Sequence, residues 1–441
     1  MKSIFVLVLV LVVLFLSLSC SESYDYSQAS LGLGLRDYSC TEAWIEVQIG
    51  SNDKTANIYI KKNDEIIQTV KVGESETLFY FDDLLPNTAY KFDAVTYEDG
   101  KEVKSNPVTF TTLDTTSHNF TWQTFTFGQH SSSELYDVAI IDENSIWAVG
   151  EIYITDSLGN TDQTPYNVAK WDGQYWKIER VYYNYQGSNV ITPLRSIHSF
   201  SENDIWVGSN QPMHWNGSEW QKWDLLGNIW NGWINQIWGT SSNDLYIVGN
   251  SGSIAHYNGR KWTKIESGTS DNLLDLRSTS DGNTVWTCGY SGDYANSVLI
   301  RIKDGVAEKI YEGSSNGQSN GFYVGPMSGV WTDNDYRVFL MTGSGLYTQK
   351  NSNEFFLEKE IARFNHGSYG IGGIKSNDIF VCGDRFVGHW NGSTYSEYSE
   401  LYRQFRTYYN ISTKGNIVCA VGTDYSDALN FGAIIAIGRR N

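Results

Sequence analysis

A short run of residues recurs along most of the chain and limits its possible folds more than any other feature. The run "NDIWVG" (203–208) has close copies in "NDLYIVG" (243–249) and "NDIFVCG" (377–383), together with four weaker ones. The glycines that end the seven runs are residues 150, 208, 249, 289, 343, 383 and 422. Most intervals between them are about forty residues. Such a period predicts repeated supersecondary units that stack on one another.

Each copy contains the signals of four short strands. In the second copy, the run "LRSIHSFS" precedes an Asn-Asp turn, the strand "IWVG", a strand that ends in "HW", an Asn-Gly turn and the strand "EWQKW". Asn-Gly favours a tight hairpin because both residues tolerate positive φ. Four strands in about forty residues are typical of a β-propeller blade, and no 3.6-residue apolar pattern supports a helical solenoid. We therefore predict an all-β chain with a seven-bladed β-propeller over residues 115–441.

The seventh copy lacks its last strand. It ends at "GAIIAIGRRN" (432–441), whereas a strand-like run, "NFTWQTFTF" (119–127), stands before the first copy. Pairing of residues 120–126 with residues 432–438 would complete the last blade and remove an exposed sheet edge. The sequence therefore predicts that the ends of the repeat region close the ring.

The composition agrees with packed strands and argues against two classes of partner. Aromatic residues make up 15% of the chain and charged residues 19%, and there are 41 glycines. The formal net charge is −18 and no basic run is present, which argues against nucleic acid and anionic lipid surfaces as partners. The cysteines and seven histidines show no spacing typical of zinc, so we expect no metal and no cofactor.

Residues 1–19 have the pattern of an export signal, with Lys2, an apolar run and small residues before Cys20. The ending "LSLSC" resembles the bacterial lipoprotein signal, although Ser17 stands where that signal usually has leucine. The resemblance implies that Cys20 carries a lipid and that residues 20–37 form a tether. It also implies an exported protein of the cell envelope, anchored at the outer membrane or cell surface. The alternative is an ordinary cleaved signal with an unmodified cysteine.

Residues 38–114 contain six or seven short β-rich runs separated by polar turns, which indicate a small sandwich. Within them "LLPNTAYKF" carries, from Leu84 to Tyr90, the L-x-P-x-T-x-Y corner motif of fibronectin type III domains. The unit resembles that family, and the resemblance implies a corner tyrosine that bonds back to its turn and a buried tryptophan, here Trp44. It implies a fold and is nearly silent on function.

The forty-residue repeat resembles the N-D-I-W … H-W-N-G-x-x-W repeats of secreted bacterial propellers, over about 315 residues. It lacks the Trp-Asp strand end of WD40 repeats, the glycine pair of kelch repeats and the Asp box of sialidases. Since those motifs would carry functional information, the resemblance implies a propeller without implying an activity.

Several side chains that recur at fixed repeat positions are expected to be structural. One strand position carries the core residues Trp147, Trp206, Tyr246, Trp286 and Phe380. Another position carries His214, His256 and His389, which would lie in different blades and bond neighbouring turns. Arg195, Arg277 and Arg406 fall in innermost-strand segments, but at different registers, so they do not predict an arginine cluster.

The longest and most aromatic loops connect blades or follow the second strand of a blade, and in a propeller such loops share one face. They predict a ligand-binding rim made of Tyr182, Tyr183, Tyr185, Trp230, Trp233 and Tyr323. Exposed rings beside amides suit a sugar or a protein partner. The alternative is that these rings fold back onto the blade edges.

These features lead us to expect a recognition protein that binds a glycan or a protein at the cell surface and reaches the membrane through its lipid anchor. One alternative is a glycan-processing hydrolase or lyase that acts at the channel mouth. Another is a structural component of an envelope or secretion complex. No catalytic residue can be assigned, since no G-x-S-x-G elbow occurs and a carboxylate pair cannot be chosen among fifty acidic residues.

Overall fold

The computed structural model describes residues 30–50, 57–71, 76–98, 100–130, 132–225, 227, 229–350, 355, 357–425 and 431–441. Apart from two 3₁₀ turns, η1 (Asn250–Gly252) and η2 (Ser399–Leu401), the regular structure in these ranges is all strand. None of the helical segments in these ranges is long and apolar enough to cross a bilayer. The export signal and Cys20 lie outside the described residues.

The chain divides into two compact units, the first made of residues up to 36 with residues 45–79 and 90–110, and the second made of the rest. Two sheets are built near the N-terminus. One has the order β1-β2-β5, with β1 (Ser30–Tyr38), β2 (Ala43–Gly50) and β5 (Glu76–Phe81). The other has the order β4-β3-β6-β7 with β8 also beside β6, and comprises β3 (Asn57–Lys62), β4 (Glu65–Lys71), β6 (Ala89–Glu98), β7 (Lys101–Lys104) and β8 (Val108–Thr111).

Part of the segment expected to be a tether is a strand. β1 starts at Ser30, and its sequence "SLGLGLRDY" alternates leucine with glycine, so Leu31 and Leu33 are both buried. The prediction of a tether up to residue 37 is therefore wrong from residue 30 onward. The strand follows a polar run, and its short alternation of leucine and glycine was not recognised as a period-2 strand pattern.

The second unit contains seven four-stranded antiparallel sheets among its described residues. Their first strands are β10 (Glu134–Asp142), β16 (Ser196–Ser201), β20 (Ile234–Ser241), β24 (Asn272–Ser278), β30 (Met327–Trp331), β34 (Ser368–Lys375) and β38 (Arg406–Lys414). Their second strands are β11 (Ser145–Ile152), β17 (Asp204–Gly208), β21 (Asp244–Gly249), β25 (Thr284–Tyr290), β31 (Arg337–Thr342), β35 (Asp378–Gly383) and β39 (Ile417–Asp424).

The third strands are β12 (Tyr166–Trp171), β18 (Pro212–Trp215), β22 (Ser253–Tyr257), β26 (Asn296–Lys303), β32 (Gly345–Lys350), β36 (Phe386–Trp390) and β40 (Gly432–Arg440). The fourth strands are β13 (Trp176–Glu179), β19 (Trp220–Lys222), β23 (Trp262–Glu266), β27 (Val306–Ser314), β33 (Leu357–Arg363), β37 (Tyr395–Glu397) and β9 (Phe120–Phe127). Two hairpins lie between sheets: β14 (Tyr183–Tyr185) with β15 (Ser188–Val190), and β28 (Gln318–Ser319) with β29 (Phe322–Tyr323).

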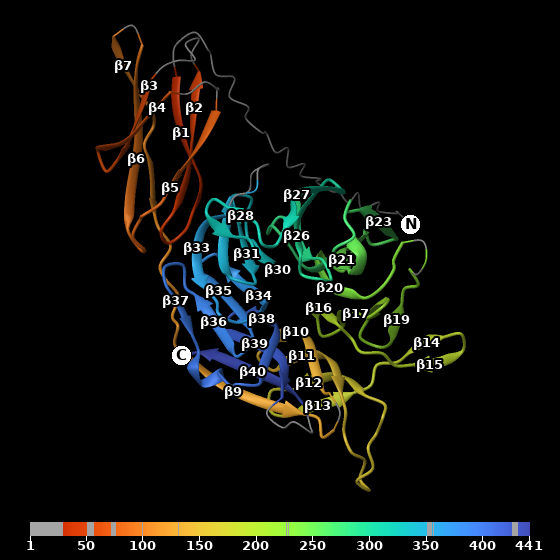
Figure 1. Ribbon diagram of the computed structural model, residues 1–441. Helices are drawn as coiled ribbons and strands as arrows, with labels where there is room; N and C mark the ends of the chain where they lie inside the picture. Colours follow the sequence, from red (N-terminus) through yellow and green to blue (C-terminus); the bar gives the residue numbers. More distant parts are fainter. Residues whose placement is uncertain are drawn as a thin grey trace, which may run out of the picture. The chain divides into compact units, whose positions relative to one another are not determined.

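The sheets form a closed ring around a common axis (Figure 1). Each first strand contacts the first strand of the next sheet, and β38 contacts β10, so the last sheet packs on the first. The last sheet is assembled from both ends of the repeat region, because β9 pairs with β40 in a register that joins Phe120 to Arg440 and Phe127 to Ala433. This is a β-propeller in which β9 covers the edge that β40 would otherwise expose.

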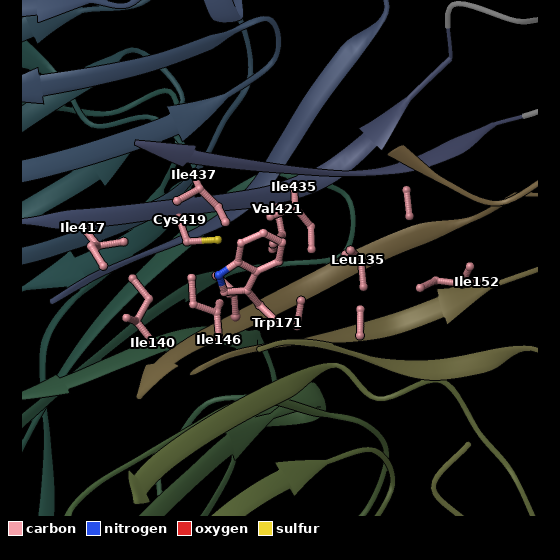
Figure 2. Packing of buried hydrophobic residues seen from close by; sticks show 14 residues of the cluster. Leu135, Ile140, Ile146, Ile152, Trp171, Ile417, Cys419, Val421, Ile435 and Ile437 are labelled. Carbon is pink, nitrogen blue, oxygen red and sulfur yellow. The ribbon is translucent and has the colours of Figure 1, made fainter. Parts of the chain in front are cut away.

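The interface between the last and first sheets is apolar. Figure 2 shows the cluster, in which Ile435 and Ile437 of β40 face Leu135, Ile146 and Trp171 of the first sheet. All five side chains are buried. The two chain ends are therefore held by core packing as well as by strand pairing.

The recurring Asp, His and aromatic residues of the repeat form one contact. In the second sheet His214 Nε2 lies 2.8 Å from Asp204 Oδ1, and the imidazole stacks on Trp206 with ring centroids 4.4 Å apart. The same arrangement occurs in the third and sixth sheets, with Asp244, His256 and Tyr246 and with Asp378, His389 and Phe380. Each histidine thus holds the first turn of its blade to the third strand, which is the structural role that its recurrence predicts.

The glycine that ends the recurring run lies directly under a neighbouring backbone in five of the seven copies. A Cβ added at Gly150, Gly249 or Gly289 would collide with a carbonyl oxygen of the chain entering the first strand, for example that of Asn272 beside Gly289. Backbone φ does not require glycine at these positions. Close approach of the first strand does.

Replacement of Gly289 by alanine is expected to lower the free energy of unfolding by about 1–3 kcal/mol, because the new methyl group would push the first strand of its own blade outward. Gly292 is a matched control in the loop after the same strand, and a Cβ there meets open space. Gly292→Ala should change stability by no more than about 0.5 kcal/mol. Thermal and urea unfolding followed by circular dichroism would compare the two, and equal stabilities would contradict the close-approach argument.

Candidate functional site

A β-bulge occurs at the same place in most of the first strands. In β10, Leu135 pairs with Gly150 and Asp137 with Val149, so Tyr136 has no partner of its own. Register shifts at the equivalent place occur in β20, β24, β30, β34 and β38. A bulge re-aims the extra side chain. Here it allows two consecutive residues of each strand to face the ring axis.

The extra residues form what we call the mouth ring. In the second sheet Arg195 takes the place of the bulge residue just before β16, and its N–H donates to the Gly208 carbonyl at 2.7 Å. The mouth ring consists of Tyr136, Arg195, Asn235, Leu274, Ser328, Tyr369 and Tyr409. All seven line a hollow of about 430 Å³, together with Glu134, Tyr290 and the polar residues Asp275 and Asn410.

Below the mouth, the hollow continues into a narrower channel. Asp275 and Asn410 also line a second cavity of about 210 Å³, and its walls come from the first strands of all seven described sheets. Polar side chains of this channel include Gln236, Arg277 and His198. The channel along the propeller axis is therefore open and polar, and its wider end is large enough for a ligand.

Arg195 is the charged centre of the mouth. Its guanidinium carbon lies 4.8 Å from the ring centroid of Trp233 and 5.2 Å from that of Tyr136, so two aromatic rings hold it by cation–π contact. Its Nε is buried without a hydrogen-bond partner. Among the described residues, no carboxylate lies within ion-pair distance of it, and Glu134 acts on it only through space. The mouth thus presents a positioned, unpaired guanidinium.

The tyrosines of the mouth are fixed by one another and by acidic neighbours. The hydroxyl of Tyr136 donates to Glu151 Oε1 at 2.8 Å, and that of Tyr409 lies 2.9 Å from the Tyr425 hydroxyl. The Tyr136 and Tyr409 rings stack at 6.0 Å between centroids, and Tyr369 packs edge-on against Tyr409 at 5.9 Å. Burial, with the nearby carboxylates, raises the pKa of Tyr136, so this phenol stays protonated.

Two buried carboxyl groups tie neighbouring blades together at the base of the mouth. Asp137 accepts hydrogen bonds from the N–H of Ile197 and from Asn410 Nδ2, both at 2.8 Å. Asp275 accepts from the N–H of Val330 at 2.9 Å. Burial raises the pKa of Asp137 to about 8 and that of Asp275 to about 7. Because their oxygens are engaged by adjacent blades, we assign them a structural role.

The structure corrects one member of the predicted rim. Trp230 is only 1% exposed, its indole N–H donates to the Gly232 carbonyl at 3.1 Å, and it packs with Trp206 and Ile234 in the core. It cannot serve as an exposed anchor. Its loop folds the ring back into the blade stack, and sequence patterns cannot distinguish this arrangement from exposure.

The other predicted rim residues lie in separate places. Trp233 is half-buried and contacts Arg195 of the mouth ring. Tyr182 is exposed beside the β14–β15 hairpin, and Tyr183 lies in it with the Lys222 ammonium 5.3 Å from its ring centroid. Tyr323 is exposed on the β28–β29 hairpin and donates to Asn316 Oδ1 at 3.0 Å. The side chain of Tyr185 lies outside the described residues.

The three arginines of the innermost segments have different surroundings. Arg195 lies in the mouth ring and Arg277 in the channel. Arg406 is removed from both by an ion pair, its Nη2 lying 2.8 Å from Asp424 Oδ2. No group of three or more His, Cys, Asp or Glu residues in the described part of the chain could hold a metal ion.

Sequence reasoning missed the rest of the mouth ring. Its members stand second in the tetrapeptides "LYDV", "LRSI", "INQI", "LLDL", "MSGV", "SYGI" and "YYNI", and only tyrosine occurs there more than once. Strict alternation also points the second residue away from the axis, because a bulge is invisible to period-2 counting. The usable signal was the narrow range of distances, 13 to 15 residues, from the second residue of each tetrapeptide to the glycine of its repeat.

Comparison with known proteins supports the fold alone. No protein-family model matches the chain, and no curated protein is detectably similar in sequence. The structure described as "YCF48 bound to D1 peptide" matches with a TM-score of 0.52 and 14% identity, over 73% of this chain and 95% of that one. The "Crystal structure of RRP9 WD40 repeats" matches with a TM-score of 0.49 and 10% identity, over 71% and 97% respectively. The first of these matches supports the β-propeller fold seen in the sheets.

Raising the pH is expected to destabilise the propeller. In the folded state burial raises the pKa of Asp137 to about 8, whereas in the unfolded chain this carboxyl group has its ordinary pKa of 3.8. The contribution of this pKa difference to the free energy of unfolding is full below pH 4 and is lost as the pH rises through 8. On the order of 2 kcal/mol is lost between pH 6.5 and 9. Urea unfolding across this range would measure the slope. Asp137→Asn, which cannot ionise there, should reduce the slope to the part that Asp275 contributes, and an unchanged slope in this variant would contradict the assignment.

Proposed function

We propose that this protein recognises a partner polypeptide and binds one of its segments in the mouth of the propeller. The observation that carries the proposal is Arg195, a guanidinium held between Tyr136 and Trp233 with no acidic partner among the described residues. An arginine in this state binds a carboxylate in two-pronged geometry. We therefore propose a segment with an acidic side chain or a C-terminal carboxylate.

The remaining mouth residues favour a peptide over a sugar. A sugar binds best on an open aromatic face, but Tyr136, Tyr369 and Tyr409 pack against one another, and Tyr290 stacks on Tyr294 with centroids 5.0 Å apart. Asn235 and Ser328 supply polar groups that suit backbone amides. A hollow of about 430 Å³ admits a few side chains.

The similarity to YCF48 is consistent with this proposal. That propeller is described as bound to a D1 peptide, so at least one structurally similar propeller binds a peptide. Identity of 14% transfers no residue of that site to this chain. The support is therefore for the class of partner and not for its sequence.

We also propose the finer architecture that the sequence predicts. The sheet orders β1-β2-β5 and β4-β3-β6-β7 are consistent with a fibronectin type III domain at residues 38–114, extended by β1. The seven described sheets would be the full set of blades over residues 115–441. A lipid on Cys20 would hold both at the outer membrane or cell surface.

Arg195→Gln is expected to abolish selection of acidic peptides. The variant keeps a polar side chain of similar length but loses the charge and the fork that bind a carboxylate, which should weaken binding by about tenfold or more. A phage library of random peptides, some with free C-termini, would be screened against the wild-type chain and the variant. Arg260→Gln, in the exposed turn between β22 and β23, is the matched control and should select the same peptides as wild type.

Three results would go against the polypeptide proposal. One is selection of peptides without a carboxylate, and another is equal selection by Arg195→Gln. The third comes from a glycan array probed in parallel. Binding of acidic glycans that disappears in Arg195→Gln would reassign the same mouth to a sugar acid.

Cys20→Ala is expected to release the protein from membranes. Export of the chain in a bacterial host, with a labelled fatty-acid precursor, should label the wild type and place it in the membrane fraction. The alanine variant should be unlabelled and recovered in soluble form. Unlabelled wild type would instead support an ordinary cleaved signal.

A further inference from the structure

Arg277 lies in the channel below the mouth, two residues after Asp275 on β24, so both side chains leave the same face of the strand. Its guanidinium carbon is 5.4 Å from the ring centroid of Trp238, on the neighbouring first strand β20. Stacking on an indole fixes the plane of the guanidinium. The charge is therefore positioned inside the channel, away from Arg195.

This guanidinium has no partner among the described residues. Its Nε is buried without a hydrogen bond, and no carboxylate lies within ion-pair distance. The two carboxylates whose fields reach it, Asp275 and Asp333, are engaged by others: Asp275 by the N–H groups of Leu276 and Val330, and Asp333 by the N–H of Ser376. A shielded cation without a counter-charge is costly, and arginine does not relieve the cost by losing its proton.

The cavity around Arg277 can accommodate a small ligand. Its volume of about 210 Å³ is many times the roughly 10–15 Å³ that one water needs on the same measure. Hydroxyl groups of Ser199, Ser412 and Thr413 line it and can donate hydrogen bonds. Lys414 lies at its end, on the last residue of β38, and adds positive charge.

We infer that the channel contains a binding site for a small oxyanion, either inorganic phosphate or a carboxylate, with Arg277 as its principal ligand. The oxyanion accepts from the guanidinium on one side and from the channel hydroxyls on the other. Burial raises the pKa of Asp275 to about 7, so this neighbour is largely neutral in weakly acidic solution and repels the anion less. The site is separate from the mouth and requires no polypeptide partner.

The test is titration of the full chain with inorganic phosphate and, separately, with acetate, at constant ionic strength. Isothermal calorimetry and ³¹P line broadening would give affinities for wild type, Arg277→Gln, Arg277→Lys and Arg260→Gln. We expect wild type to bind at least one of the two anions. Arg277→Gln should bind about tenfold more weakly or worse, since it loses a charged two-pronged donor. Arg260→Gln, in the exposed turn between β22 and β23, should bind as wild type does.

Arg277→Lys keeps the charge and covers the case in which the glutamine variant fails to fold, as judged by circular dichroism. It should retain binding more weakly than wild type, because an ammonium lacks the planar fork. A preference for phosphate over acetate, or the reverse, identifies the class of anion. Absence of binding of either anion by the folded wild type overturns the inference, and so does equal affinity in a folded Arg277→Gln variant.

Discussion

The close approach of most first strands to the glycine below them governs the structure around the ring axis. Because Gly150, Gly249 and Gly289 carry no Cβ, a carbonyl of the entering chain can lie directly over them. The strand then takes an extra residue as a bulge, and two successive side chains reach the axis in place of one. In β10 and β24 the first of the two lines the mouth, and the second, Asp137 or Asp275, bonds the neighbouring blade.

The residues that stabilise the blades are largely different from the residues that line the mouth. The repeated residues, such as Asp204, Trp206 and His214, make the same contacts in several blades and hold each blade together. The mouth-ring positions carry five residue types in seven blades, and each of them faces the hollow. Asn235 also bonds the next blade, since its Nδ2 donates to the Leu273 carbonyl at 2.8 Å. The two unpaired guanidiniums, Arg195 and Arg277, occupy such axis-facing positions at different depths.

The sequence predicts the scaffold better than the site, for physical reasons. Strand pairs, Asn-Gly turns and the joining of residues 120–126 to the last strand follow from local chemistry that recurs from copy to copy. The mouth does not follow from it, because its residues share a position and not a residue type. Trp230 illustrates the limit: an aromatic residue in a long loop reads as exposed, yet its indole lies in the core against Ile234. Trp233, three residues later, does reach the mouth.

The pairing of β9 with β40 also sets the order in which the protein can be completed. β9 is synthesised about 300 residues before the strand beside it, so it leaves the ribosome long before its partner exists. Until β40 arrives, the first sheet lacks the isoleucines that cover it, and its apolar face stays open. Contacts of such long sequence separation form slowly and late. Ring closure is then the final folding step, and a chain that stalls before it would present that open face to chaperones and proteases.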